Sequence, residues 1–273
     1  TPLQHIIHDS RNIQSLTNNI IWNIFADQEH NIWLGTDYGI SLSRYNSALQ
    51  FIPISQITGT GDGNQFYSLF RDSKGFYWFG GTNGLIRFTD PAGDKHNAIW
   101  YRMGDKTYPL SHNRIRHIYE DKEQQLWIAT DGSINRYDYA TRQFVHYNIV
   151  DSTGTYNTNW TYYMFEDNAG HLWISTCLGG IFVVDKHRLM QSASGQYVAE
   201  QNYSVHNGLS GMFINQIIPD NEGNVWVLLY NNKGIDKINP RTREVTKLFA
   251  DELNGEKSPN YLLCDEDGML WVG

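Results

Sequence analysis

The sequence predicts an all-β protein, a β-propeller built from four-stranded blades. Six tryptophans recur along the 273 residues, each with an aspartate six residues upstream. The pairs are Asp27 with Trp33, Asp72 with Trp78, Asp121 with Trp127, Asp167 with Trp173, Asp220 with Trp226 and Asp265 with Trp271. Successive tryptophans are 45, 49, 46, 53 and 45 residues apart. This period fits one propeller blade and is too long for leucine-rich or tetratricopeptide repeats.

The first two strands of each blade surround the aspartate. The positions three and two residues before it are apolar in all six repeats, as Ile24 and Phe25 are in the first, and predict the inner strand. The aspartate then opens a turn in which its carboxylate can accept backbone N–H groups. Apolar residues flank every repeated tryptophan, which indicates a second strand covered on both faces. We therefore expect the tryptophans to form the core between blades.

The third and fourth strands follow the tryptophan. A glycine precedes the third strand in five repeats, at Gly39, Gly84, Gly132, Gly180 and Gly234. Glycine permits the positive φ that a tight hairpin turn requires. The fourth strand has a weaker pattern, and we expect it at residues 49–52, 99–101, 144–147, 197–198 and 245–248.

The domain organisation follows from the repeats. We expect a single propeller segment over residues 1–273, with blades at about 18–61, 62–110, 111–156, 157–209 and 210–256 and an incomplete blade at 257–273. Residues 1–9 are expected to form the outer strand of the closing blade. Because the sixth repeat contains only two strands, we expect a segment of a longer chain, in which about six repeats belong to a seven-bladed ring.

Composition narrows the range of functions. Aromatic residues make up 14% of the chain and charged residues 18%, with 7 prolines, which indicates an ordered domain with an ample core. The formal net charge of −8 argues against nucleic acid or an anionic membrane as the partner. No apolar run approaches the roughly 18 residues of a membrane-spanning helix. Cys177 and Cys264 lie in non-equivalent strands and are expected to be free thiols.

The repeat pattern, clearest at residues 21–40 and 66–85, resembles the two-component-regulator propeller repeat. That family builds the periplasmic sensor region of hybrid two-component systems in Bacteroidetes. The resemblance covers nearly all of the chain. It implies a non-catalytic periplasmic sensor that detects glycan-derived oligosaccharides and passes the signal to a histidine kinase. It also implies a second propeller and an immunoglobulin-like domain in the same chain, and a homodimer of the full-length protein.

Candidate ligand-binding residues lie where the inner strands begin, because the loops of a propeller converge there on its central funnel. The residue five positions before each aspartate differs from repeat to repeat: Trp22, Tyr67, Arg116, Tyr162, Asn215 and Asn260. Aromatic, guanidinium and amide groups can stack on sugar faces or bond hydroxyls and carboxylates. Packing between blades is the alternative role. Four asparagines, eight residues before the aspartate, are predicted to be turn caps: Asn19, Asn64, Asn113 and Asn159.

Two other functional classes stay open at this point. One is a structural or protein-interaction propeller that contacts no ligand, to which the longer inserts at 91–113 and 187–211 could contribute. A weaker one is a propeller glycan hydrolase or lyase, which needs a pair of carboxylates. Acidic residues occur at Asp62, Glu120, Asp151 and Glu166 without a recognisable pairing. No catalytic residue is predicted, and because the ten histidines lack metal-ligand spacing, neither a metal nor another cofactor is expected.

Overall fold

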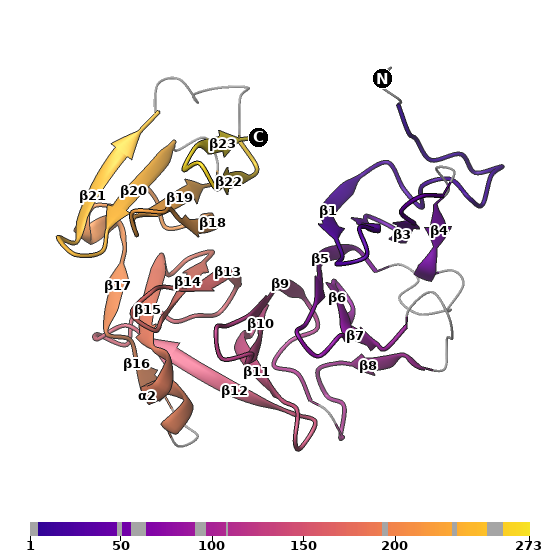
Figure 1. Ribbon diagram of the computed structural model, residues 1–273. Coiled ribbons are helices and arrows are strands. Elements are labelled where there is room, and N and C mark those ends of the chain that lie inside the picture. The colour runs from indigo at the N-terminus through magenta and orange to yellow at the C-terminus, as the bar shows by residue number, and fades with distance from the viewer. Residues whose placement is uncertain are drawn as a thin grey trace. The chain divides into compact units, whose positions relative to one another are not determined.

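The structure, a computed structural model, describes residues 5–47, 51–55, 64–90, 97–107, 109–192, 196–230, 234–249 and 259–273. These residues form mainly antiparallel sheets that follow one another along the chain, with little helix (Figure 1). The chain divides into two compact units. The N-terminal unit comprises Thr1–Ile128 and Tyr137–Phe144, and the C-terminal unit comprises Ala129–Arg136 and Val145–Gly273.

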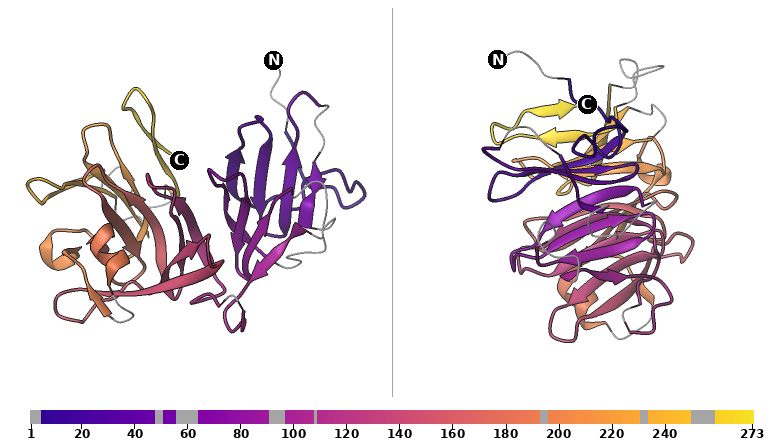
Figure 2. Two further views of the ribbon diagram at one scale, coloured as in Figure 1. Left: turned by 60° about the horizontal axis from the view of Figure 1, so that its bottom comes forward. Right: turned by 90° about the vertical axis from the view of Figure 1, so that its right-hand side faces the viewer.

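The first two repeats each form a four-stranded sheet, or blade, in the N-terminal unit. Blade 1 has the strand order β1 (Ile21–Ala26), β2 (Ile32–Thr36), β3 (Gly39–Ser43) and β4 (Ile52–Pro53). Blade 2 has the order β5 (Phe66–Arg71), β6 (Tyr77–Gly81), β7 (Gly84–Phe88) and β8 (Ile99–Tyr101). The inner strands β1 and β5 pack against each other, so the two twisted sheets lie face to face (Figure 2).

The third sheet has five strands. Its order is β16 (Gln196–Val198), β12 (Gln143–Val150), β11 (Ser133–Asp138), β10 (Leu126–Thr130) and β9 (Ile115–Glu120). Four of these strands come from the third repeat, in the order that the repeat predicts. The additional strand, β16, comes from the following repeat.

The remaining repeats lie in the C-terminal unit. Blade 4 comprises β13 (Thr161–Glu166), β14 (His171–Thr176), β15 (Ile181–Asp185) and β17 (Gln201–Tyr203). Blade 5 comprises β18 (Ile214–Pro219), β19 (Val225–Leu229), β20 (Ile235–Asn239) and β21 (Glu244–Leu248). The sixth repeat contributes β22 (Leu262–Cys264) and β23 (Leu270–Val272), and two short helices, α2 (Lys186–Gln191) and η2 (Val205–Asn207), follow β15 and β17.

The expected fourth strand at residues 197–198 is wrong. These residues belong to β16, which pairs in parallel with β12 of the preceding blade, Tyr197 opposite Ile149. The fourth strand of blade 4 is β17, in which Tyr203 pairs with Ile181. After β15 the chain folds into α2, and the first extended segment beyond it reaches the open edge of β12. An open edge presents unpaired N–H and C=O groups that a further strand can satisfy.

The expected outer strand at residues 1–9 is not formed by residues 5–9. Residues 1–4 lie outside the described part of the chain. The backbone N–H of His8 donates to Asn19 Oδ1 at 2.6 Å, and the N–H of Asp9 donates to Ser15 Oγ at 2.9 Å. Two backbone N–H groups that would bond a neighbouring strand are therefore bonded to side chains of the loop before β1.

The six Asp and Trp pairs are joined by a hydrogen bond in every repeat. The indole Nε1 donates to the aspartate Oδ2 at 2.7 to 3.1 Å. In the first five repeats the other carboxylate oxygen, Oδ1, accepts the N–H groups two and four residues downstream. The predicted turn role of the aspartate is confirmed. The indole bond was not predicted, and it arises because the hairpin brings residue i+6 back over the carboxylate.

The turn itself imposes positive φ three residues before each tryptophan. Four repeats have glycine there, at Gly75, Gly170, Gly223 and Gly268, with φ between 81° and 85°. His30 and Gln124 occupy the same position in the other two repeats with φ of 61°. The turn geometry is therefore the same in all six repeats, and glycine is the residue that adopts it at least cost.

Four of the six repeated tryptophans, Trp33, Trp78, Trp127 and Trp173, are buried in the core, as predicted. Trp33 contacts the blade 2 residues Tyr77 and Phe79, with ring centroids 5.0 and 5.6 Å apart. Trp78 lies in a buried cluster with Ile115 and Ile118 of the third repeat. The last anchor, Trp271, is 57% exposed.

A tyrosine from the neighbouring repeat also reaches two of these carboxylates. Tyr77 donates its hydroxyl to Asp27 Oδ2 at 3.2 Å, and Tyr139 donates to Asp72 Oδ2 at 2.7 Å. Burial, followed by the charge of Asp27, raises the pKa of Tyr77 to about 12. Burial and the bond to Asp72 raise the pKa of Tyr139 further. Each of these two aspartates thus links the tryptophan of its own blade to the next blade.

Hydrogen bonding to the turn carboxylates predicts loss of stability in acid. At Asp27, Asp167 and Asp220 burial is the largest single influence and raises the pKa, but hydrogen bonds from the indole and turn N–H groups outweigh it. At Asp265 the bond from Trp271 has the largest effect. All four pKa values lie below the ordinary aspartate value of 3.8. A lowered folded-state pKa stabilises the fold above the unfolded-state value and ceases to do so as pH falls through the folded-state value.

We therefore expect the urea midpoint to fall as the solution is acidified from about pH 5 to pH 3, because the carboxylates take up protons in the unfolded state before they do so in the folded state. Burial raises the pKa of Asp236, so this carboxyl alone would make the fold more stable in acid. The four turn aspartates with lowered pKa values outnumber it. The measurement is urea denaturation at pH 7, 5, 4 and 3. Replacing Asp167 with asparagine should make the dependence shallower. A midpoint that stays constant or rises from pH 5 to pH 3 would contradict this expectation.

Candidate functional site

The loops before the inner strands are held against the preceding blade. The backbone N–H of Gly39 donates to the carbonyl of Asn64 at 3.4 Å, and Gly84 donates to Asn113 at 2.7 Å. At Gly35, a Cβ would lie 2.7 Å from the carbonyl oxygen of Phe66. Glycine is needed there because the backbone at the start of β5 approaches so closely. These contacts position the residues that were predicted to bind a ligand.

Three of those residues come together in the N-terminal unit. The rings of Trp22 and Tyr67 meet edge to face with centroids 5.3 Å apart. The guanidinium carbon of Arg116 lies 5.7 Å from the centroid of the Tyr67 ring. Trp22 is 49% exposed, and the other two side chains are partly buried. The second residues of three successive inner strands thus form one cluster.

Two polar residues that the sequence reasoning missed hold this cluster. Asp37 Oδ1 accepts the indole N–H of Trp22 at 3.0 Å and also a hydrogen bond from the side-chain amide of Gln65. The Tyr67 hydroxyl donates to Gln65 Oε1. Asp37 lies in the turn between β2 and β3, and Gln65 directly precedes β5. The signal was available, because the residue directly before each inner strand also varies between repeats.

The C-terminal unit carries a second aromatic group. Tyr162 contacts Phe213 edge to face at 5.2 Å, and Phe213 stacks on Tyr230 at 4.4 Å. Tyr230 is 47% exposed. The side-chain amide of Asn215 donates to the backbone carbonyl of Asn260 at 3.2 Å. Tyr162 was predicted, whereas Phe213 and Tyr230 were missed.

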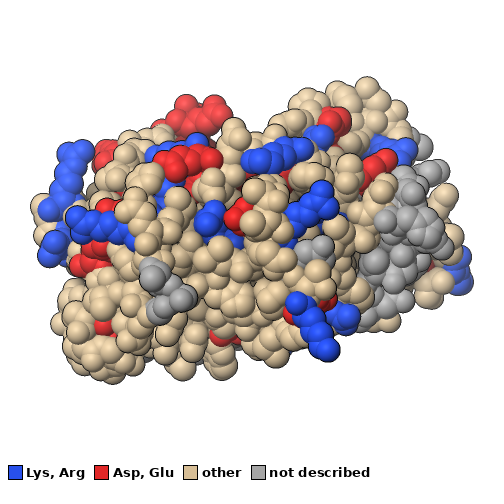
Figure 3. Space-filling view, turned by 90° about the horizontal axis from the view of Figure 1, so that it is seen from below, with Lys and Arg blue, Asp and Glu red and all other residues tan. Residues whose placement is uncertain are grey.

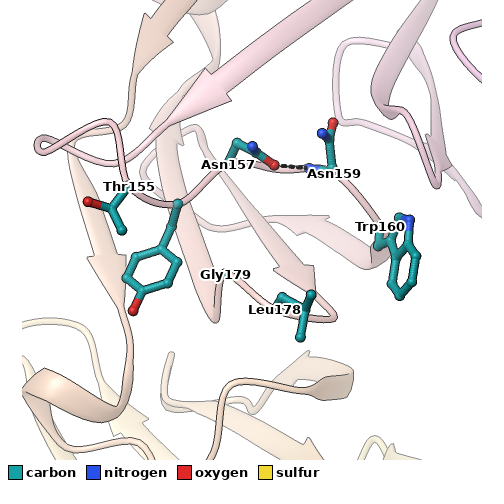
Figure 4. A pocket seen from close by; sticks show the side chains of 7 residues that line it. Thr155, Asn157, Asn159, Trp160, Leu178 and Gly179 are labelled. Carbon is teal, nitrogen blue, oxygen red and sulfur yellow. Dashed lines mark hydrogen bonds between the residues drawn. The ribbon is translucent and has the colours of Figure 1, made fainter.

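A cavity of about 270 Å³ opens beside the start of β13 (Figure 4). Its wall is formed by the loop between β12 and β13 and by the turn between β14 and β15. The lining residues are 155–157, 159, 160, 178 and 179. All of them belong to the C-terminal unit, and none was among the predicted site residues.

Three of the four asparagines predicted to be turn caps instead accept hydrogen bonds from other segments of the chain. Asn64 Oδ1 accepts from Thr82 Oγ1 at 3.1 Å and from the Asn83 N–H at 2.9 Å. Asn113 Oδ1 accepts the N–H of Met103 at 2.7 Å, and Asn19 Oδ1 accepts the N–H of His8 as described above. Asn159 differs, because its own backbone N–H donates to Asn157 Oδ1 at 3.0 Å.

The acidic residues that a glycosidase would need have structural partners. Both oxygens of Glu120 accept the backbone N–H of Ser73, at 3.1 and 3.0 Å. Asp151 accepts the backbone N–H groups of Thr153 and Tyr156. Glu166 forms an ion pair with Lys186, and Asp62 lies outside the described residues.

Within the part of the chain that the structure describes, no group of three or more His, Cys, Asp or Glu side chains could hold a metal ion. Cys177 and Cys264 are free, as predicted. No helix there is long and apolar enough to cross a membrane. On the face seen in Figure 3, basic and acidic side chains are intermixed.

Comparison with known sequences identifies the repeat. The sequence model described as "Two component regulator propeller" matches residues 15–38, 60–83 and 109–132. Each matched stretch contains one inner strand together with the aspartate and the tryptophan that follow it. Three stretches of the chain therefore carry two-component regulator propeller repeats. No curated protein matches this propeller significantly.

Solved structures agree with this assignment. The chain is 95% identical to the extracellular domain of a hybrid two-component system from B. thetaiotaomicron, with a TM-score of 0.79. The match covers 100% of this chain and 37% of that chain. A second such extracellular domain from the same organism is 20% identical, with a TM-score of 0.73 and coverage of 98% and 33%. The chain therefore spans about a third of the length of these two extracellular domains.

A third structure shows the fold alone. Virginiamycin B lyase from Staphylococcus aureus is 14% identical, with a TM-score of 0.65 and coverage of 92% of this chain and 76% of that one. Together with the four-stranded sheets, these comparisons confirm the predicted β-propeller fold.

Proposed function

We propose that this propeller is part of the periplasmic sensor region of a hybrid two-component system. In this proposal it is non-catalytic and detects an oligosaccharide released from a glycan, and the signal passes to a histidine kinase in the same protein. The observation that carries the proposal is the 95% identity to the extracellular domain of such a system. A second propeller, an immunoglobulin-like domain and a homodimer of the full-length protein belong to the same proposal.

The chemistry at the starts of the inner strands supports a sugar ligand. Trp22 offers an exposed indole face whose N–H is already bonded to Asp37, so its orientation is set before a ligand arrives. Arg116 supplies N–H donors that suit hydroxyl or carboxylate oxygens. Tyr162, Asn215 and Asn260 add an aromatic ring and amides in the other unit. Preorganised aromatic and polar groups reduce the ordering cost of binding.

We expect Trp22→Ala and Arg116→Ala each to weaken oligosaccharide binding by about tenfold, the loss of one well-formed contact. The measurement is calorimetric titration of the extracellular domain that contains this chain. Tyr45→Ala is the matched control. Tyr45 is 61% exposed and packs on His30 at the opposite end of blade 1, so its loss should leave affinity unchanged.

The alternatives give different results in the same experiment. If the domain binds an oligosaccharide with unchanged affinity in both variants, the site proposed at Trp22 and Arg116 is wrong. If no oligosaccharide binds, the structural or protein-interaction propeller becomes the better interpretation. Turnover of a sugar during the titration would instead favour a hydrolase or lyase.

A further inference from the structure

The cavity beside β13 is built around an exposed tryptophan with an unusual backbone. Trp160 has φ of 55°, in the left-handed region that bulky side chains rarely adopt. Its N–H donates to the carbonyl of Asp131 at 3.0 Å, and its carbonyl accepts the N–H of Cys177 at 3.0 Å. The backbone is therefore held from both sides. The indole is 48% exposed, so the conformation is not explained by burial of the side chain in the core.

This conformation presents the indole at the rim of the cavity. Figure 4 shows Trp160 and Leu178 on the same side of the opening, with Asn157 and Asn159 along the loop above them. Leu178 is 67% exposed. Residues held in sparsely populated backbone conformations cluster at functional sites, including ligand sites.

The polar groups of the cavity are amides and hydroxyls. Asn157 uses Oδ1 to accept the N–H of Asn159, and this bond holds the loop beside the opening. Among the residues that the structure describes, no hydrogen bond engages the side-chain amide of Asn159 or the indole N–H of Trp160. Thr155 and Tyr156 add hydroxyl groups. These groups offer both donors and acceptors to a ligand.

The lining contains no charged residue. A ligand carboxylate or sulfate that entered the cavity would lose water without gaining a counter-charge, which is costly. The volume of about 270 Å³ lies just below the range of roughly 300 to 1,000 Å³ that is usual for small-molecule sites. An apolar platform, uncharged hydrogen-bonding groups and this size together match a single uncharged sugar ring.

We propose that this cavity is a binding subsite for one uncharged pyranose unit of an oligosaccharide. The ring stacks on Trp160, and its hydroxyls bond the amide of Asn159. The inference rests on the proposed sensor function and adds to it a location in blade 4 and a preference for neutral over acidic glycans. It is independent of the cluster formed by Trp22, Tyr67 and Arg116, which contains both a guanidinium and a carboxylate.

The test is calorimetric titration of the extracellular domain that contains this chain with two sets of probes. The neutral set comprises malto-, cello-, xylo-, manno- and galacto-oligosaccharides, and the acidic set comprises oligogalacturonides and heparin fragments. The variants are Trp160→Ala and Asn159→Ala, with Tyr45→Ala as the control. Circular dichroism melting establishes that each variant is folded. Asn159→Ala keeps the test informative if the backbone at residue 160 does not tolerate alanine.

The expected result is that at least one neutral probe binds and that both cavity variants weaken it by about tenfold or more. Binding of a neutral probe that neither variant weakens would overturn the subsite and leave the sensor function intact. Binding of acidic probes alone would overturn the neutral preference. If neither set binds, the proposed function itself fails, and the subsite fails with it.

Discussion

Trp78→Ala is expected to lower the free energy of unfolding by about 3 to 5 kcal/mol, the cost of removing a large aromatic side chain from a packed core. The side chain is fully buried. Its ring lies 4.9 Å from Tyr137 and 5.9 Å from Tyr101, and its Nε1 donates to Asp72 at 2.7 Å. Truncation therefore removes contacts with the third repeat together with the bond that closes the turn of blade 2. Urea denaturation of the 273-residue chain measures the loss.

Two further variants separate the contribution of ring packing from that of the indole hydrogen bond. Trp78→Phe keeps an aromatic ring but loses the indole N–H, and should cost less than alanine because Asp72 retains its bond from Tyr139. Trp22→Ala removes a half-exposed tryptophan and should cost below about 1 kcal/mol. If the alanine variants at positions 78 and 22 were equally stable, the core between blades would not depend on the repeated tryptophan.

Lys186→Met is the second change with a large expected effect, a loss of about 3 to 5 kcal/mol in the free energy of unfolding. Lys186 Nζ lies 2.8 Å from Glu166 Oε1, and the exposed fractions of the two side chains are 0% and 5%. Removing the ammonium leaves a carboxylate buried without its counter-charge. The pair joins the first residue of α2 to the last residue of β13, so its loss should also loosen the insert that carries β16.

The double variant Glu166→Met with Lys186→Met tests the cause. With both charges removed, no uncompensated ion stays buried, and the stability should return close to that of the unmodified protein. Urea denaturation of the two single variants and the double variant forms a thermodynamic cycle. Additive losses would mean that the two side chains act independently and that the ion pair has no energetic role.

The repeated elements could be predicted because their causes are local. The strands around each tryptophan follow from apolar residues next to turn residues. The six turns share a positive φ because the aspartate bonds the backbone two to four residues away. Even so, the bond from Trp33 to Asp27 was missed. It depends on the path of the hairpin, which spacing alone does not reveal.

The candidate site was only partly predictable. Varying residues at one repeat position led to Trp22, Tyr67 and Arg116, and the structure brings these three together. Asp37 and Trp160 were missed, because one acts through a bond from another strand and the other is displayed by a strained backbone. Trp160 does occupy the variable position directly before an inner strand, but neither the hydrogen bond nor the backbone strain has a pattern along the chain. The ligand role of all six predicted residues stays a prediction until affinities are measured.

The sequence by itself determined the all-β propeller blades, the turn role of the six aspartates and the burial of the first tryptophans, because each depends on residues within one repeat. Only the tertiary structure decided that β16 pairs with β12 of the preceding blade and that Lys186 neutralises Glu166. It also decided that an uncharged cavity opens beside Trp160. These features depend on contacts between segments that lie far apart in the chain, and the energies of such contacts come from burial and geometry, which the order of residues does not display.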